Sequence, residues 1–274
     1  MTDKLQESES QETPSSDQHQ ESEAADAGAK QQKSSTGTKP HRGIYLLPNL
    51  FTSAALFSGF YAVIAGMNGH FEKAAIAIFV AMVLDGLDGR VARMTNTQSE
   101  FGAQYDSLAD MVSFGVAPAL VAFSWSLSSA GKLGWCAAFI YVAGAALRLA
   151  RFNTQIGSVD KRFFVGLPSP AAAALVAGMV WVGAEYDLDT STYVFAVAML
   201  VAASGILMVS NIYYHSFKDV DFKGKVPFVS LLLVILVFAI ISIDPATLLW
   251  LIFLIYACSG PVQALIRLRR RKQS

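Results

Sequence analysis

The stretch DGLDGRVARMTNTQSEFGAQYDSLAD, residues 85–110, decides the fold, because it sets aspartates between long apolar runs. Asp85 and Asp88 are three residues apart, so both side chains lie on one face if the segment is a helix. The same argument holds for Asp106 and Asp110, which are four residues apart. Polar residues between the pairs let the chain turn. The sequence therefore predicts two helices whose acidic faces meet at one end.

The composition of the whole chain indicates that lipid, rather than water, surrounds most of it. Of the 274 residues, 53% are hydrophobic and 15% are charged, whereas soluble domains carry roughly 25% charged residues. A helix that crosses the hydrocarbon core of a membrane needs about 20 mostly apolar residues. We therefore predict an all-α, polytopic transmembrane helical bundle with about eight spans. The predicted spans are Leu46–Gly66, Ala74–Ala92, Tyr105–Leu127, Leu133–Ala150, Pro168–Ala184, Tyr193–Val209, Val226–Ile243 and Ala246–Ile266.

Charged residues outside the spans predict the orientation of the bundle. Lys and Arg gather on the side of the aspartates, and this excess marks the cytoplasmic side of a membrane protein. Both termini are then cytoplasmic, and the candidate site lies at the cytoplasmic face. Residues 1–42 contain no aromatic residue and are rich in Ser, Gln, Glu and Lys, so we expect a disordered cytoplasmic tail. Residues 43–274 form the predicted transmembrane domain.

Ionisable residues within membrane helices are energetically expensive, so the acidic cluster indicates function. Carboxylates that converge in a partly dry cleft repel one another unless cations neutralise them. Oxygen ligands without sulfur or imidazole favour Mg²⁺ or Mn²⁺, and two such ions about 3.5 to 4 Å apart can clamp a phosphoryl group. We therefore predict a divalent-metal site with two ions. The competing interpretation, a solvated helix cap, suits a lone acidic pair better than four carboxylates together.

Small and basic residues accompany the carboxylates. Gly89 and Gly102 have no side chain, so a bulky nucleotide can approach the backbone there. Ala92 keeps the same helix face open one turn beyond Asp88. Arg93 can offer fixed hydrogen-bond donors to a phosphate at the same end. The segment thus predicts a site for a phosphate-containing ligand beside the metals.

The ordered set of acidic, small and basic residues in this segment resembles the signature of the CDP-alcohol phosphatidyltransferase family at every fixed position. This resemblance implies a transmembrane helical fold, usually a homodimer, that moves a phosphatidyl group from CDP-diacylglycerol to an alcohol and releases CMP. It also implies that divalent metals are held by the four aspartates and that Asp110 is the base that takes the proton from the acceptor hydroxyl. The positions that carry the resemblance are Asp85, Asp88, Gly89, Ala92, Arg93, Gly102, Asp106 and Asp110.

The resemblance implies further contacts to CDP-diacylglycerol. Asn49 and Thr52, in the PNLFT sequence at the start of the first span, are implied to contact the nucleotide. Ser99 is implied to contact the CDP part, although a hydroxyl in a loop is as often merely solvated. Within the signature, the implied contacts are Gly89, Ala92, Arg93 and Gly102.

Four stretches resemble the phosphatidylserine synthase branch of the family: YLLPNLFTSAALFSGFYA, DSLADMVSFGVAPA, ALRLARFN and FVGLPSPAAA. The expected acceptor is therefore L-serine. The carboxylate of serine needs a cation, and the planar fork of Arg148 or Arg151 suits a carboxylate, with Asn153 beside them. The competing interpretation is that these arginines only mark the cytoplasmic side or hold lipid phosphate.

The expected partners are CDP-diacylglycerol, L-serine and membrane lipids, without nucleic acid, and the expected location is a bacterial cytoplasmic membrane. Another acceptor, such as glycerol 3-phosphate, inositol phosphate or choline, stays open, although a phosphorylated acceptor calls for a denser cationic cluster. A cation transporter is the alternative from a different class, but transporters place such acids near the membrane midplane. Direct displacement by the serine hydroxyl is favoured over a covalent enzyme intermediate, because the signature contains no obvious non-metal nucleophile.

Overall fold

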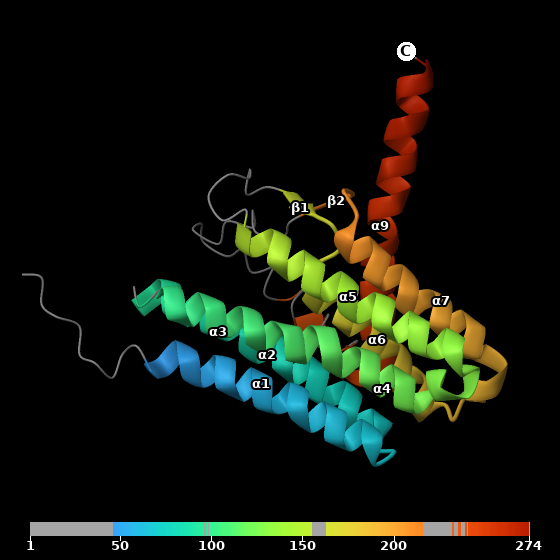
Figure 1. The fold of residues 1–274 in the computed structure, drawn as a ribbon, viewed down its shortest axis with the longest axis horizontal. Helices are drawn as coiled ribbons and strands as arrows, with labels where there is room; N and C mark the ends of the chain where they lie inside the picture. The colour runs from blue at the N-terminus through green and yellow to red at the C-terminus, as the bar shows by residue number, and fades with distance from the viewer. Residues whose placement is uncertain are drawn as a thin grey trace, which may run out of the picture. The chain divides into compact units, whose positions relative to one another are not determined.

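The structure is a computed structural model that describes residues 46–95, 97, 99–154, 163–215, 232, 235–236, 239 and 241–273. This described part of the chain consists mainly of helices (Figure 1). The predicted tail, residues 1–42, lies outside the described residues, and so does most of the seventh predicted span, Val226–Ile243. Both therefore stay predictions.

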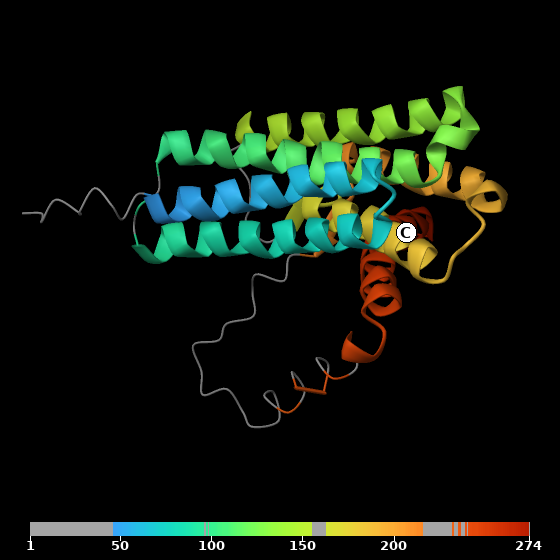
Figure 2. The same ribbon diagram turned by 90° about the horizontal axis from the view of Figure 1, so that it is seen from below.

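The first three predicted spans are three neighbouring helical rods. Helix α1 (Leu46–Met67) packs against α2 (Phe71–Thr95). The third rod begins with α3 (Glu100–Asp110), continues through the π-helical segment η1 (Met111–Val116) and ends with α4 (Ala117–Trp125). Figures 1 and 2 show these three rods running side by side. Apolar segments in a membrane form helices because a helix satisfies its backbone hydrogen bonds within itself.

In the described residues after α4, a short 3₁₀ turn and four helices follow. The turn η2 (Leu127–Ala130) precedes α5 (Lys132–Thr154), which packs against α7 (Thr190–Val209). Helix α6 (Ser169–Glu185) packs against α2 and α9 (Pro245–Gln273). These helices correspond to the fourth, fifth, sixth and eighth predicted spans, and α9 alone runs well beyond its predicted end.

The architecture is that of an α-helical membrane protein, as the sequence predicts. Two described helices do not meet the criteria for a membrane span by length and composition: α2 carries charged residues in its last three turns, and α6 has only 17 residues. The number of spans and the side of each terminus stay predictions. Five described helical segments are long and apolar enough to cross a membrane by length and composition: Asn49–Met67, Glu100–Trp125, Lys132–Thr154, Thr190–Val209 and Pro245–Ile266.

Helix α6 is the most deeply buried helix of the described bundle. Twelve of its 17 residues are buried, and most of these are Ala, Gly or Val. Gly178 lies against Trp250 of α9, and Gly183 lies against Trp125 of α4. Small residues suit this position because membrane helices associate through close backbone approach rather than through the hydrophobic effect.

A short antiparallel strand pair, which the sequence analysis did not predict, joins the segment before α6 to the segment after α7. Strand β1 (Phe163–Val165) pairs with β2 (Tyr213–His215). After β1 the chain turns at Gly166, whose φ of 82° side-chain-bearing residues rarely adopt. The backbone amide of Leu167 then donates to the carbonyl of Leu207 at 3.0 Å. The strand pair and this hydrogen bond fix the place where α6 begins.

Two aspartates outside the membrane-spanning segments cap the starts of helices. The Asp189 carboxylate accepts hydrogen bonds from the hydroxyl groups of Ser191 and Thr192, each at 2.7 Å, and from the Ser191 amide at 3.1 Å. These hydrogen bonds, with Ser191 foremost, lower the pKa of the Asp189 carboxyl below its ordinary value. Asp244 accepts a hydrogen bond from the amide of Thr247 at 3.0 Å in the same way. Both carboxylates satisfy amides that a helix leaves free in its first turn.

Helices α5 and α7 cross at a pair of glycines. A Cβ atom added to Gly144 would collide with the backbone carbonyl of Gly205. One added to Gly205 would lie against the backbone of Ile140 and Tyr141. None of these backbone atoms can move aside unless the two helices separate. The missing side chains therefore set the distance between α5 and α7.

We expect Gly144→Ala to lower the thermal unfolding midpoint of the detergent-solubilised protein, because the added methyl group meets a main-chain carbonyl. Overpacking of this kind costs roughly 1–3 kcal/mol. The measurement is the fraction of monodisperse protein that survives a temperature series in size-exclusion chromatography. Gly86→Ala is the matched control, since a Cβ atom at Gly86 would meet nothing within 4 Å. Equal midpoints for the two variants would contradict the close crossing.

Candidate active site

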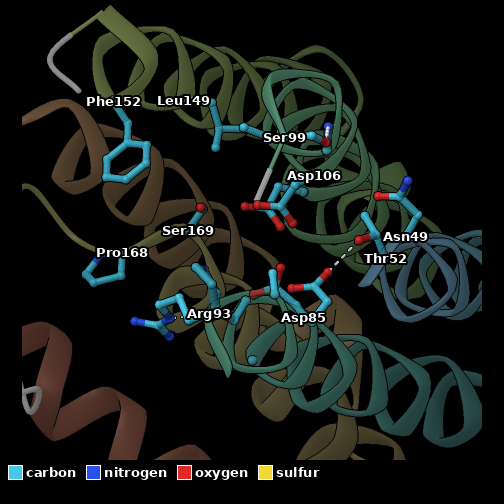
Figure 3. A pocket seen from close by; sticks show the side chains of 18 of the residues that line it. Asn49, Thr52, Asp85, Arg93, Ser99, Asp106, Leu149, Phe152, Pro168 and Ser169 are labelled. Atoms are coloured by element: carbon cyan, nitrogen blue, oxygen red, sulfur yellow. Dashed lines mark hydrogen bonds between the residues drawn. The ribbon is translucent and has the colours of Figure 1, made fainter. Parts of the chain in front are cut away.

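Three of the four signature aspartates lie together, two on the last three turns of α2 and one on α3. One carboxylate oxygen from each of Asp85, Asp88 and Asp106 lies within 4.8 Å of the others. Figure 3 shows Asp85 and Asp106 facing each other across the space between these helices. Asp110 follows one turn after Asp106 and lines the same cavity. The two acidic helix faces therefore meet, as their spacing in the sequence predicts.

The turn between α2 and α3 is fixed by local hydrogen bonds. Ser99 is the N-cap of α3, and its hydroxyl accepts a hydrogen bond from the amide of Gly102 at 3.0 Å. Thr97 is buried, and its amide donates to the carbonyl of Ala92 at 3.1 Å. The hydroxyl groups of Thr95 and Thr97 pair at 2.7 Å. These bonds set the angle at which the two acidic helices meet.

Helix α1 is tied by side chains to both acidic helices. The Thr52 hydroxyl donates to Oδ2 of Asp88 at 2.7 Å, and the two side chains are only 4% and 5% exposed. The next residue, Ser53, pairs through its hydroxyl with that of Tyr105 on α3 at 2.8 Å. Ser53 also donates to the carbonyl of Asn49 at 2.8 Å. Thr52 thus orients one carboxylate of the cluster directly.

A cavity of about 620 Å³ opens beside the aspartates. Every residue predicted to contact CDP-diacylglycerol lines it, as do all four aspartates. Of the three predicted serine contacts, Arg148 lines the cavity, whereas Arg151 and Asn153 do not. Further lining residues, which the sequence analysis did not single out, are Gly86, Thr97, Ala103, Leu149, Phe152, Pro168, Ser169 and Pro170.

Arg148 brings a positive charge from α5 to the wall of this cavity. Its Nη1 atom donates to the hydroxyl of Ser169, at the start of α6, at 2.7 Å. Its Nε atom is buried and has no hydrogen-bond partner among the described residues. The guanidinium group is close enough to Asp110 for their charges to attract. A buried donor without a partner is costly, so Nε marks a place where a ligand can accept a hydrogen bond.

Ser169 is therefore a candidate functional residue that the sequence analysis missed. Its side chain is 1% exposed and accepts a hydrogen bond from Arg148, and it lines the cavity together with Pro168 and Pro170. Figure 3 shows Ser169 and Pro168. The signal that pointed to it was the FVGLPSPAAA stretch, which contains all three residues. Nothing in the sequence indicated that this stretch contacts an arginine of another helix.

Arg151 and Asn153 instead make hydrogen bonds to other parts of the bundle. Nη1 of Arg151 donates to Oδ1 of Asn211, in the segment between α7 and β2, at 3.2 Å. Nδ2 of Asn153 donates to the hydroxyl of Ser107 at 2.9 Å. Ser107 directly follows Asp106, so this second bond joins α5 to the acidic part of α3. Both side chains tie together the elements that surround the cavity.

The donor set suits a hard divalent cation. Three carboxylates within 4.8 Å of one another repel strongly unless a positive charge lies among them. Oδ1 of Asp106 is buried and has no hydrogen-bond partner among the described residues. A metal ion would satisfy this oxygen as a ligand. Because Mg²⁺ and Mn²⁺ prefer oxygen ligands, the residues present fit either ion.

Comparison with known proteins identifies the family. Residues 45–209 match the sequence profile of the CDP-alcohol phosphatidyltransferases. A Helicobacter pylori protein named CDP-diacylglycerol–serine O-phosphatidyltransferase is 40% identical over 200 residues, which cover 73% of this chain and 84% of the relative. The chain belongs to the CDP-alcohol phosphatidyltransferase family. The resemblance seen in the signature is thus confirmed.

Relatives from distant organisms carry the same name. A Mycobacterium leprae protein is 34% identical over 224 residues, covering 80% of this chain and 74% of its own length. A Methanocaldococcus jannaschii protein is 35% identical over 195 residues, covering 71% of this chain and 87% of its own length. Both are named CDP-diacylglycerol–serine O-phosphatidyltransferase. The resemblance to the serine branch of the family is therefore confirmed as well.

We expect Thr52→Val to weaken Mn²⁺ binding, because valine keeps the shape of the side chain but removes the hydroxyl that orients Asp88. Loss of a hydrogen bond to a metal ligand lowers metal affinity by roughly 10- to 100-fold. The measurement is a Mn²⁺ titration of the purified protein, followed by electron paramagnetic resonance. Thr52→Ser keeps the hydroxyl and should bind Mn²⁺ nearly as the parent protein does. Parent-like binding by Thr52→Val would show that this hydroxyl does not shape the site.

Proposed function

We propose that this protein is a membrane enzyme that transfers a phosphatidyl group from CDP-diacylglycerol to L-serine, giving phosphatidylserine and CMP. The observation that carries the proposal is the cavity, in which converging carboxylates lie beside an arginine with an unpartnered donor. The family and the shared name of the relatives support the same reaction. They favour it over a cation transporter, the alternative that the intramembrane acids left open.

Divalent metal ions are the cofactors that the proposal requires, with two ions of Mg²⁺ or Mn²⁺ as the expected set. Asp85, Asp88 and Asp106 would hold them, with Asp110 at the edge of the cluster. When bound, the ions would neutralise the negative charge of the substrate's pyrophosphate and polarise the phosphorus–oxygen bonds that form and break. The chain itself supplies the orientation of these ligands, through the hydrogen bond from Thr52 to Asp88.

The nucleotide end of CDP-diacylglycerol is assigned to the wall formed by α1, the end of α2 and the start of α3. Asn49, Ala92, Ser99 and Gly102 lie on this wall. Gly89 leaves it open, because a Cβ atom added there would meet nothing within 4 Å. The remaining contact on this wall is Arg93. Its Nε donates to a main-chain carbonyl at 2.8 Å, which holds the guanidinium group where its other donors can reach a phosphate.

The proposed chemical step is an in-line displacement at the phosphorus that carries the diacylglycerol. The serine hydroxyl oxygen forms a bond to this phosphorus, and the bond from phosphorus to the CMP oxygen breaks. The proton of the serine hydroxyl passes to the carboxylate of Asp110, and CMP leaves with the electron pair of the broken bond. Asp110 is suited to this role because it lies in the cavity one turn from Asp106 and near Arg148.

The serine carboxylate is assigned to Arg148. Its buried, unpartnered Nε supports this choice, and the bond from Nη1 to Ser169 orients the guanidinium group. Among the described residues that line the cavity, the cations are Arg93 and Arg148. A phosphorylated acceptor would call for more positive charge than these two side chains supply. Arg151 and Asn153 support the serine site indirectly, by holding the end of α5.

The arrangement in the membrane completes the proposal. Eight spans with both termini in the cytoplasm would place the cavity at the cytoplasmic face of a bacterial membrane. The water-soluble product, CMP, would then leave directly into the cytoplasm, while phosphatidylserine would stay in the membrane. The basic residues at the same end of the helices, Arg90, Arg93, Arg148 and Arg151, support this orientation. A homodimer is the assembly that the family resemblance suggests.

The decisive assay is CMP release from CDP-diacylglycerol by the purified protein with serine, glycerol 3-phosphate, inositol phosphate and choline in turn. We expect release with serine and a divalent metal. Asp85→Asn, Asp88→Asn and Asp106→Asn should each abolish turnover, because a neutral amide is a poor replacement for a carboxylate ligand. Release with another acceptor but not with serine would overturn the assignment. Near-normal turnover by one of the variants at saturating metal would remove that residue from the proposed metal site.

We expect Arg148→Lys to raise the Michaelis constant for serine by about tenfold or more and to change that for CDP-diacylglycerol little. Lysine keeps the charge but lacks the planar pair of donors that Ser169 and a carboxylate can share. The measurement is steady-state kinetics with each substrate varied in turn. Arg151→Lys is the comparison, and because Arg151 does not line the cavity we expect a smaller effect. If only the lipid substrate binds less well, Arg148 contacts a lipid phosphate instead.

A further inference from the structure

The helix that carries Asp106 and Asp110 changes its winding directly after Asp110. From Met111 to Val116 it is a π-helix, and the amide of Ala117 donates to the carbonyl five residues before it, that of Val112. A π turn holds about one residue more than an α turn. Segments of this kind are rare and frequently occur at functional sites.

The contacts with α1 show where the extra residue is taken up. The Ser113 hydroxyl donates to the carbonyl of Ala55 at 3.1 Å, and Ser113 lies against Gly59. Farther along, Val121 lies against Gly66. Ser113 and Val121 are eight residues apart in the chain, whereas two α-helical turns take about 7.2 residues. In an unbroken α-helix they would point about 80° apart, and the extra residue of the π turn brings both closer to the direction of α1.

A proline and a tyrosine maintain this winding. Pro118 has no amide hydrogen, so it cannot donate to the carbonyl of Phe114, four residues before it, as an α-helix requires. The hydroxyl of Tyr141 on α5 donates to this carbonyl at 2.9 Å. Tyr141 is 0% exposed, and a buried carbonyl without a donor is costly in a membrane protein. Tyr141 thus replaces the backbone donor that Pro118 lacks.

We propose that Tyr141 is a positioning residue for phosphatidyl transfer, which acts by stabilising the π turn and so fixes the direction in which Asp110 points. Loss of the extra residue would turn Asp110 by about 100° about the helix axis, relative to α4. Helix α4 cannot follow, because it packs against α1, α5 and α6. The Asp110 carboxylate would therefore leave the cavity. This inference rests on the proposed function, in which Asp110 is the base.

The same helix, α5, carries both Tyr141 and Arg148. The two residues are seven positions apart, which is about two helical turns, so they lie on one face. Arg148 lines the cavity, while Tyr141, about two helical turns earlier in α5, contacts the π turn. One helix thus positions the proposed serine contact and, through Phe114, the proposed base.

The test is Tyr141→Phe in the full-length protein, which removes only the hydroxyl. We expect kcat to fall by about five- to tenfold, because the variant loses one hydrogen bond that positions the base. The Michaelis constants for serine and CDP-diacylglycerol, and the affinity for Mn²⁺, should stay near those of the parent. Tyr214→Phe is the matched control, because Tyr214 is also 0% exposed and donates to a backbone carbonyl, that of Ala257 on α9, at 3.0 Å. It should keep its kcat.

Two outcomes would overturn the proposal. One is a parent-like kcat for Tyr141→Phe. The other is an equal loss of kcat in Tyr141→Phe and Tyr214→Phe, which would mean that both hydroxyl groups act only through the stability of the fold. If Asp110→Asn is inactive while Tyr141→Phe is fully active, the proposed function stands and this inference fails. If Asp110→Asn is active, the assignment of the base itself fails.

A second pair of variants keeps the proposal testable if Tyr141→Phe folds poorly. Pro118→Ala restores an amide that can donate to the Phe114 carbonyl, so the Tyr141 hydroxyl should no longer be needed there. We expect the double variant Pro118→Ala/Tyr141→Phe to be no slower and no less stable than Pro118→Ala alone. Additive losses of kcat or of thermal stability in the double variant would show that Tyr141 does not act through this carbonyl.

Discussion

Repulsion between carboxylates at the end of two membrane helices is the constraint on which the rest of the described structure depends. Carboxylates within 4.8 Å of one another, at the end of apolar helices, favour separation of the helices. Hydrogen bonds between different helices oppose this separation. Thr52 joins α1 to Asp88 of α2, Ser53 joins α1 to Tyr105 of α3, and a third bond joins α3 to α5. A bound cation would turn the same repulsion into attraction, which supports the proposed divalent-metal site.

The acidic half of the site could be predicted from the sequence because it depends on helical periodicity alone. Spacings of three and four place the carboxylates on common faces whatever the rest of the chain does. The role of Thr52 was less accessible. The family resemblance implies that Thr52 contacts the nucleotide, which stays a prediction, but its hydrogen bond to Asp88 was not foreseen. The spacing of residues within one helix cannot show that a carboxylate accepts a hydrogen bond from a hydroxyl on another helix.

The proposed acceptor half of the site could be predicted only in part, because it depends on how α5 is rotated about its axis. Arg148 and Arg151 are three residues apart, and both lie near the cytoplasmic end of the predicted span, so the sequence could not choose between them. The choice is made by packing, since the close crossing of Gly144 with Gly205 sets the face that α5 turns toward α7. The helices themselves were predicted well, while the π turn and the three-residue strands were not. The insertion of one extra residue into a helix leaves little mark on its apolar pattern, and strands this short contain too few residues for a periodic pattern.

The strand pair has a consequence for how such an enzyme can change. The carboxylate cluster is built on α2 and α3, whereas the wall that contains Ser169 begins where β1 and β2 hold the start of α6. The carboxylates and Ser169 are therefore held mainly by different elements, although α5 contacts both regions through Arg148 and Asn153. If the serine site lies at Arg148 and Ser169, as proposed, substitutions in the short loop after Gly166 would reshape the pocket for the alcohol while the carboxylates keep their positions. On that proposal, an enzyme with this fold could change its acceptor alcohol and keep the same reaction.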